Sequence, residues 1–183
     1  MSVQGSLDGT PSGIPGASTL LEVNGIVTQF STPRGTVNAV DGVSLRLERG
    51  KTLGIVGESG SGKSVLSRSI MGLLPSNATR RGTVRFEGRD ITDASPTELR
   101  ALWGVEMAMI FQHPMTALNP VMKIGKQITE SLRHHLDMPK SDARETAVAL
   151  LRAVKIPEAD KRFSSYPHEM SGGMRQRVVI AVA

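Results

Sequence analysis

The sequence predicts an α/β domain in which strands and helices share one aliphatic core. Three patterns indicate this fold: alternating apolar and polar residues near the N-terminus, a short apolar run that ends in glycine just before a helix, and apolar residues at helical spacing in the second half. The 183 residues suffice for one domain, and 39% of them are hydrophobic. Aromatic residues make up only 3%, so the core must be built from aliphatic side chains and methionine.

Four segments of the first half have strand patterns. "TLLEVNGIVTQF" (19–30) predicts a strand interrupted at Gly25, and "VSLRLERG" (43–50) alternates as an antiparallel edge strand with one solvated face does. "KTLGIVG" (51–57) is a short apolar run, for which a buried central strand is the prediction. "GTVRFEG" (82–88) is another alternating strand.

Helix signals follow the strands. "GKSVLSRSIMGLLP" predicts a helix that ends before Pro75. In "SPTELRALW", Ser95 is the expected N-cap, Pro96 the first helical residue and Glu98 the partner in a capping box.

The second half combines one further strand with two longer helices. "VEMAMIFQ" (105–112) has a strand pattern. Apolar residues every fourth position predict a helix over 123–136, and "SDARETAVALLRAVKI" (141–156) predicts another with Ser141 as its cap. The first 18 residues are rich in Gly, Ser and Pro, and we expect a disordered tail there.

Composition excludes several classes of protein. The absence of cysteine rules out a disulfide framework and a thiolate metal site. The net charge is +5, but the basic residues are scattered, so no dedicated nucleic-acid surface is predicted. The longest apolar run, "VVIAVA", is far shorter than the roughly 20 residues of a membrane-spanning helix. Work at a membrane would therefore require another chain.

"GESGSGKS" (57–64) matches the pattern G-x-x-x-x-G-K-[ST] of a phosphate-binding loop. Glycines let the backbone N–H groups curl inward around phosphate oxygens, and the following helix adds the positive end of its dipole. A flexible glycine turn beside a surface lysine is the plainer alternative. The residues predicted to bind the nucleotide are Gly57, Glu58, Ser59, Gly60, Ser61, Gly62, Lys63 and Ser64.

A second small-residue opening stands at "SGGMRQR" (171–177), before an apolar helix. It resembles the signature motif of ABC-type ATPases, and "MIFQHP" (109–114) resembles their Q-loop, with Gln112 as the glutamine. The resemblance implies a P-loop fold with an antiparallel β subdomain, a parallel-sheet core and a helical subdomain over about 113–170, within a partial ATPase domain at 19–183.

The resemblance also implies roles for single residues. Lys63 would reach the phosphates of ATP, while Ser64 would ligate Mg²⁺. Gln112 would ligate Mg²⁺ or position the attacking water, and Phe30 would stack on adenine, unless it is simply a core phenylalanine. The second opening would contact the ATP held by another subunit, although a plain helix cap is the alternative; its residues are Ser171, Gly172 and Gly173.

Two longer stretches, "MIFQHPMTALNPVMKIGKQI" and "YPHEMSGGMRQRVVIA", resemble the ATPase subunits of bacterial oligopeptide, dipeptide and nickel importers. This implies a head-to-tail dimer with an identical or paralogous ATPase, permease subunits in the membrane and, indirectly, an extracytoplasmic solute-binding protein. The protein would then lie at the cytoplasmic face of the bacterial inner membrane as a peripheral subunit. The transported solute stays open.

The family's next elements would be an apolar strand ending in Asp-Glu, which supplies the catalytic Glu, and a later histidine. The printed chain contains neither, so we expect the chain alone not to turn over ATP and the full-length protein to hydrolyse it. The alternatives are a genuinely truncated nucleotide-binding or interaction protein that does not hydrolyse ATP, and an ABC-type ATPase of a non-importer class.

Overall fold

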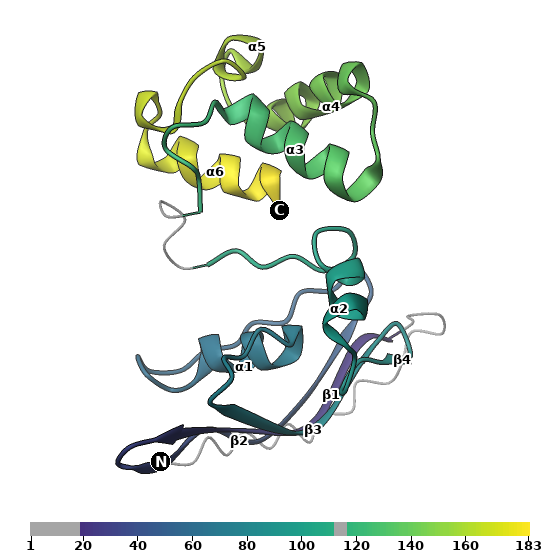
Figure 1. Ribbon diagram of the computed structural model, residues 1–183, viewed down its shortest axis with the longest axis vertical. Coiled ribbons are helices and arrows are strands. Elements are labelled where there is room, and N and C mark those ends of the chain that lie inside the picture. The colour runs from purple at the N-terminus through teal and green to yellow at the C-terminus, as the bar shows by residue number, and fades with distance from the viewer. Residues whose placement is uncertain (1–18, 112–116) are drawn as a thin grey trace. The chain divides into compact units, whose positions relative to one another are not determined.

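The computed structural model describes residues 19–111 and 117–183 (Figure 1). The chain divides into two compact units, Met1–Leu99 and Arg100–Ala183. The predicted tail over 1–18 lies outside the described residues. Within the described ranges, no helix has both the length and the apolar character needed to cross a membrane.

The first unit is built on a four-stranded antiparallel sheet in the order β2-β1-β3-β4. Its strands are β1 Thr19–Thr32, β2 Gly35–Glu48, β3 Ala78–Phe86 and β4 Arg89–Asp90. The predicted interruption of β1 is confirmed, because the pairing register shifts between Val23 and Ile26, on either side of a left-handed Gly25. β2 is an edge strand, as its alternation predicts.

Helix α1 (Lys63–Met71) packs against one face of this sheet (Figure 1). Alternation along β1 and β3 buries Val23, Ile26 and Val84 completely. Leu66 and Ile70 are the large aliphatic residues that α1 buries in return. The unit therefore has one sheet layer, one helix layer and a small aliphatic core between them.

Two predicted strands do not form. Residues 51–57 lie in no strand, and their apolar side chains are exposed, with Val56 91% exposed. Residues 105–111 hold only an isolated bridge from Trp103 to Met107. A central strand needs a neighbour on each side, and apart from the bridge at Met107 none of the described segments pairs with either run. The predicted parallel-sheet core is thus absent from the described residues.

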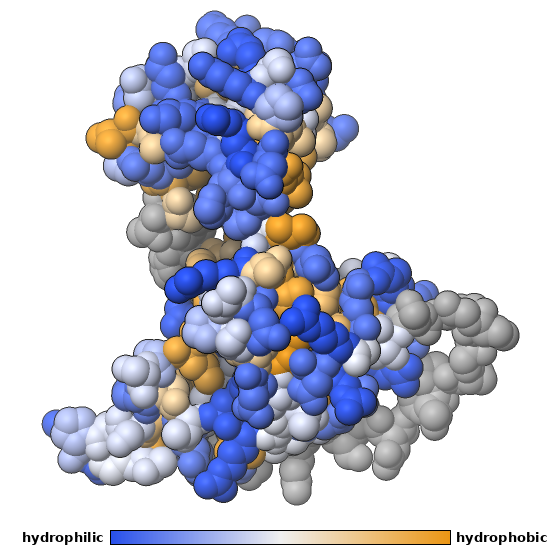
Figure 2. Space-filling model, turned by 45° about the vertical axis from the view of Figure 1, so that its right-hand side comes forward, coloured by the Kyte–Doolittle hydropathy of each residue, from blue (hydrophilic) through white to orange (hydrophobic). Residues whose placement is uncertain are grey.

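These unformed strands leave hydrophobic side chains at the surface. Figure 2 shows hydrophobic residues in orange among mostly hydrophilic ones. The exposed large hydrophobics in the two runs are Leu53, Ile55, Val56, Val105, Ile110 and Phe111.

The second unit is helical. Its elements are α3 Ile124–Leu136, α4 Lys140–Ala153, the short α5 Ala159–Arg162, the 3-10 turn η2 Pro167–Glu169 and α6 Gly172–Val182. They enclose one cluster of buried residues: Leu118, Ile124, Ile128, Ala147, Val148, Leu151, Ile156, Ala159, Met170, Val178, Val179 and Ala181.

Gly125 shows how tightly this unit is packed, because a Cβ at this position would overlap the ring of Phe163. Its amide also donates to the carbonyl of Phe163 at 2.8 Å, and Ile124 N–H donates to Ser165 O at 2.9 Å. The segment that leads toward α6 therefore caps the start of α3.

The predicted cap of α4 is wrong. Pro139 is the N-cap, the helix begins at Lys140, and Ser141 lies inside the first turn, where its hydroxyl donates to Asp142. Pro139 has the extended ψ that its ring permits before a helix and needs no side-chain oxygen to start it.

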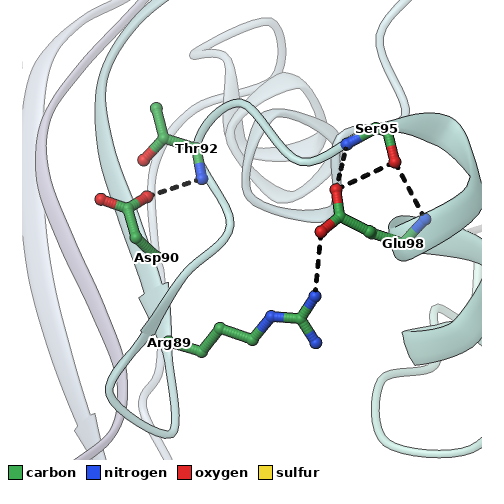
Figure 3. A network of polar contacts seen from close by, with 5 residues as sticks. All are labelled: Arg89, Asp90, Thr92, Ser95 and Glu98. Atoms are coloured by element: carbon green, nitrogen blue, oxygen red, sulfur yellow. Dashed lines mark hydrogen bonds and ion pairs between the residues drawn. The ribbon is translucent and has the colours of Figure 1, made fainter.

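The predicted capping box of α2 (Pro96–Leu102) is confirmed (Figure 3). Ser95 N–H donates to the Glu98 carboxylate at 2.8 Å, and Glu98 N–H donates to Ser95 Oγ at 3.3 Å. Arg89 adds an exposed ion pair to Glu98 at 3.4 Å. The bonds from the backbone and side chain of Ser95 lower the pKa of Glu98 below its usual 4.5.

This lowered pKa predicts a pH-dependent cap. The stabilisation is complete above the ordinary pKa of 4.5 and is lost as the pH falls through the lower, folded-state value. Glu98→Gln removes that charge, so the Tm difference between wild type and variant should be largest near neutral pH and shrink toward about pH 3. Glu145→Gln, at an exposed position of α4, is the control. A difference that stays constant with pH would contradict the assignment.

Candidate functional site

The glycine loop over 57–64 leads directly into α1. Gly60 and Gly62 have φ values of 81° and 88°, in the left-handed region that glycine adopts without strain. Ser61 N–H closes a turn on Glu58 O at 3.2 Å. The predicted loop conformation therefore depends on glycine at the two positions where the chain turns.

Close approach makes a second demand on the glycines. A Cβ on Gly62 would overlap the carbonyl oxygen of Ala39, which belongs to β2. A Cβ on Gly57 would lie 2.7 Å from Ser61 Oγ. The loop is thus pressed against β2 at one point and folded on itself at another.

Lys63 closes the loop from within. Its ammonium donates to Gly57 O at 2.8 Å, to Glu58 O at 2.7 Å and to Ser61 Oγ at 3.2 Å. These three acceptors match the three protons of the ammonium. The lysine already lies inside the loop, and phosphate oxygens are charged acceptors that would compete well for the same protons.

The start of α1 is suited to an anion. Gly62, the N-cap, has no side chain that could cap the helix, and the first turn contains no acidic residue. The positive end of the helix dipole is therefore not neutralised locally. The hydroxyl of Ser64 lies exposed in this first turn.

A magnesium ion at this place would need help from phosphate. Among the described residues, no group of three or more His, Cys, Asp or Glu side chains could hold a metal. Ser64 supplies one oxygen of the kind that Mg²⁺ accepts, and Mg²⁺ commonly takes few protein ligands together with substrate phosphates and water. The donor set fits a nucleotide-bound ion. Gln112, the other predicted ligand, lies outside the described residues.

Phe30 lies near the end of β1, half-buried, with Val37 of β2 and Ala78 of β3 as its partners on the two sides. It belongs to the same unit as the glycine loop. Its role in stacking stays a prediction.

The second opening is built differently. Ser171 is the N-cap of α6, and its Oγ accepts from Met174 N–H at 3.3 Å. Gly172 and Gly173 are exposed, have no positive φ, and an added Cβ on either would meet nothing within 4 Å. The packing of this chain therefore does not require glycine there, although alanine would favour the helix by up to about 1 kcal/mol.

Sequence reasoning missed a cluster of polar residues where α1 meets β1 and β3. Arg80 donates to the carbonyls of Ser69 and Thr92, and burial lowers its pKa, against the influence of Asp93 and Asp90. The hydroxyls of Thr28 and Ser69 meet at 2.7 Å in the same region. The available signal was a serine between Leu66 and Ile70 on the apolar face of the predicted helix.

Comparisons with known proteins identify the family of this chain. A family model described as ABC transporter matches residues 40–183. The oligopeptide transport ATP-binding protein OppD of Salmonella typhimurium is 52% identical over 91% of this chain and 50% of its own length. The dipeptide transport ATP-binding protein DppD of Bacillus subtilis is 48% identical over 90% and 50%. The chain spans about half the length of the curated relatives it matches.

A solved structure confirms the predicted ABC-type fold. The dimeric structure of MJ0796, a bacterial ABC transporter cassette, superposes with a TM-score of 0.77, covering 89% of this chain and 68% of that one at 23% identity. Another structure of the same cassette, in a post-hydrolysis state bound to ADP and Pi, has a TM-score of 0.75 at 24% identity. At these identities the likeness establishes the fold.

The loop geometry predicts unequal effects of two alanine substitutions. Both Gly60→Ala and Gly62→Ala place a side chain in the left-handed region, at a cost of about 1–2 kcal/mol. Only Gly62→Ala also overlaps the Ala39 carbonyl. Triphosphate binding, measured by calorimetry on the intact protein, should therefore weaken much more for Gly62→Ala. Equal losses would show that the contact with β2 does not shape the loop.

Proposed function

We propose, because this chain belongs to the ABC transporter family, that it is the ATP-binding part of a peptide-type importer subunit. The intact protein would couple binding and hydrolysis of ATP to solute uptake through a membrane permease. The observation that carries this proposal is the glycine loop, closed by Lys63 and placed at an uncapped helix start. The identity to peptide transport ATP-binding proteins supports the solute class.

In this proposal the loop binds the phosphates of ATP. Lys63 turns from the carbonyls of the loop to the β- and γ-phosphates. Ser64 and Gln112 hold Mg²⁺, and Phe30 stacks on the adenine. Bound Mg²⁺ would neutralise phosphate charge as the bond to the γ-phosphate breaks. Gln112 would also orient the attacking water. The remaining contacts come from the loop residues: Gly57, Glu58, Ser59, Gly60, Ser61 and Gly62.

The second opening serves another subunit. Ser171 and the N–H groups of Gly172 and Gly173 would contact the γ-phosphate of ATP held by the partner ATPase. The open space above both glycines supports this role, since a phosphate and a second chain must come close there. The two subunits, identical or paralogous, would then dimerise head to tail around two ATP molecules.

The wider assembly follows from the same family. The ATPase domain would begin at residue 19, and a helical subdomain over about 113–170 would dock on the permease. The protein would lie on the cytoplasmic face of the bacterial inner membrane, with an extracytoplasmic solute-binding protein delivering the peptide. Loss of labelled-peptide uptake in cells with Lys63→Ala, and its retention in wild type, would test the solute class.

The two openings can be tested separately on the intact protein. Gly173→Arg meets no atom of this chain within reach of its Cβ, so the fold and ATP binding should survive. Hydrolysis should fall more than about tenfold, because the arginine blocks approach of the partner's ATP. Ala149→Arg, the same addition at an exposed helical position, should leave hydrolysis unchanged. Full hydrolysis by Gly173→Arg would rule out the proposed role of the second opening.

A further inference from the structure

Two buried hydroxyls join α1 to β1. Thr28 and Ser69 are the polar residues that are buried among the described ones, and both are 0% exposed. Their oxygens lie 2.7 Å apart, although 41 positions separate them in the sequence. Every other buried side chain in this layer is apolar, so this pair is the one bond between two buried side chains among the described residues of the interface.

The direction of the bond follows from the proton count. Ser69 Oγ also lies 2.7 Å from the carbonyl of Val65, one turn earlier in α1, and donates its only proton there. Thr28 must then donate to Ser69. The serine is thus held by its own helix and by β1 together.

Arg80 holds the same residue from the next strand. It is the direct partner of Thr28 in the ladder between β1 and β3, and it donates to the carbonyl of Ser69. Its second amino group donates to the carbonyl of Thr92. Thr28 therefore bonds to the side chain of Ser69 and Arg80 to its main chain, and these two residues are paired on neighbouring strands.

Both parts of the candidate nucleotide site belong to the two elements that this contact joins. Phe30 follows Thr28 by two residues in an unbroken stretch of the ladder with β3, which places it on the same face roughly 7 Å away. Lys63 precedes Ser69 by six residues in α1, roughly 9 Å along the helix axis. A shift of α1 along β1 would change the span from ring to phosphate loop.

We propose that the Thr28–Ser69 hydroxyl pair is a positioning pair, which sets the distance between the base-stacking ring of Phe30 and the phosphate loop. It thereby makes the site selective for an adenine nucleotide over a bare polyphosphate. This inference rests on the proposed function, since it takes the loop as the phosphate site and Phe30 as the base contact. Apolar packing of Leu66 and Ile70 alone would hold the helix without fixing its position along the strand.

The bond direction yields variants that separate positioning from stability. Ser69→Ala leaves the buried Thr28 hydroxyl without an acceptor and should be the most destabilising change. Thr28→Val removes the donor while Ser69 keeps its bond to Val65. The double variant Thr28→Val/Ser69→Ala removes both hydroxyls and leaves neither a buried donor nor a buried acceptor unpaired, so its Tm should return toward that of wild type.

The decisive measurement is the affinity of the intact protein for ATP and for inorganic triphosphate. In the double variant ATP should bind roughly five- to tenfold more weakly, the equivalent of about one hydrogen bond, and triphosphate should bind as before. Thr28→Ser as a single substitution keeps both hydroxyls and should therefore retain the selectivity for ATP. Ser67→Ala removes a hydroxyl that bonds only within α1 and is the matched control.

Equal weakening for both ligands, or no change for either, in a double variant that melts like wild type would overturn the proposal. Phe30→Ala separates this failure from that of the proposed site. If Phe30→Ala lowers ATP selectivity and the double variant does not, only the positioning role is wrong. If Phe30→Ala has no effect on selectivity, the base contact lies elsewhere, and the site assignment fails together with the inference.

Discussion

The seating of α1 on the antiparallel sheet is the constraint on which the candidate site depends. The helix carries Lys63 at its first position, and the loop before it is pressed against β2 where Gly62 meets the Ala39 carbonyl. Aliphatic burial holds the helix on the sheet, while the bond between Thr28 and Ser69 fixes one point of contact. Because the phosphate loop has few other anchors among the described residues, its position is that of the helix.

The hydrogen-bond donor that the loop would offer to a phosphate is already bonded within the loop. The Lys63 ammonium is bound to two carbonyls and a hydroxyl of the same loop, so it is neither buried without partners nor free in water. A phosphate would replace neutral acceptors with charged ones, which form stronger hydrogen bonds. In the proposed function, rotation of the Lys63 side chain would exchange these internal acceptors for phosphate oxygens.

Sequence patterns predicted what is decided locally. The capping box at Ser95 and Glu98 involves neighbours three residues apart, and the glycine loop carries its own backbone requirements. The strand expected at 51–57 failed because an apolar run cannot show which segment will pair with it. The contact between Thr28 and Ser69 was invisible for a related reason, since it joins two elements whose packing offset no local pattern encodes. Gln112 falls outside the described residues, so its prediction stands untested.

The two small-residue openings differ in a way that fits two different tasks. At the first, glycines are required by this chain itself, through left-handed angles and the contact with β2, and a lysine fills the loop. At the second, neither Gly172 nor Gly173 is required by any angle or neighbour, and the helix would be more stable with alanine. In the proposed head-to-tail dimer this difference is expected, because the first opening would hold its ligand by itself and the second would complete the site of another subunit.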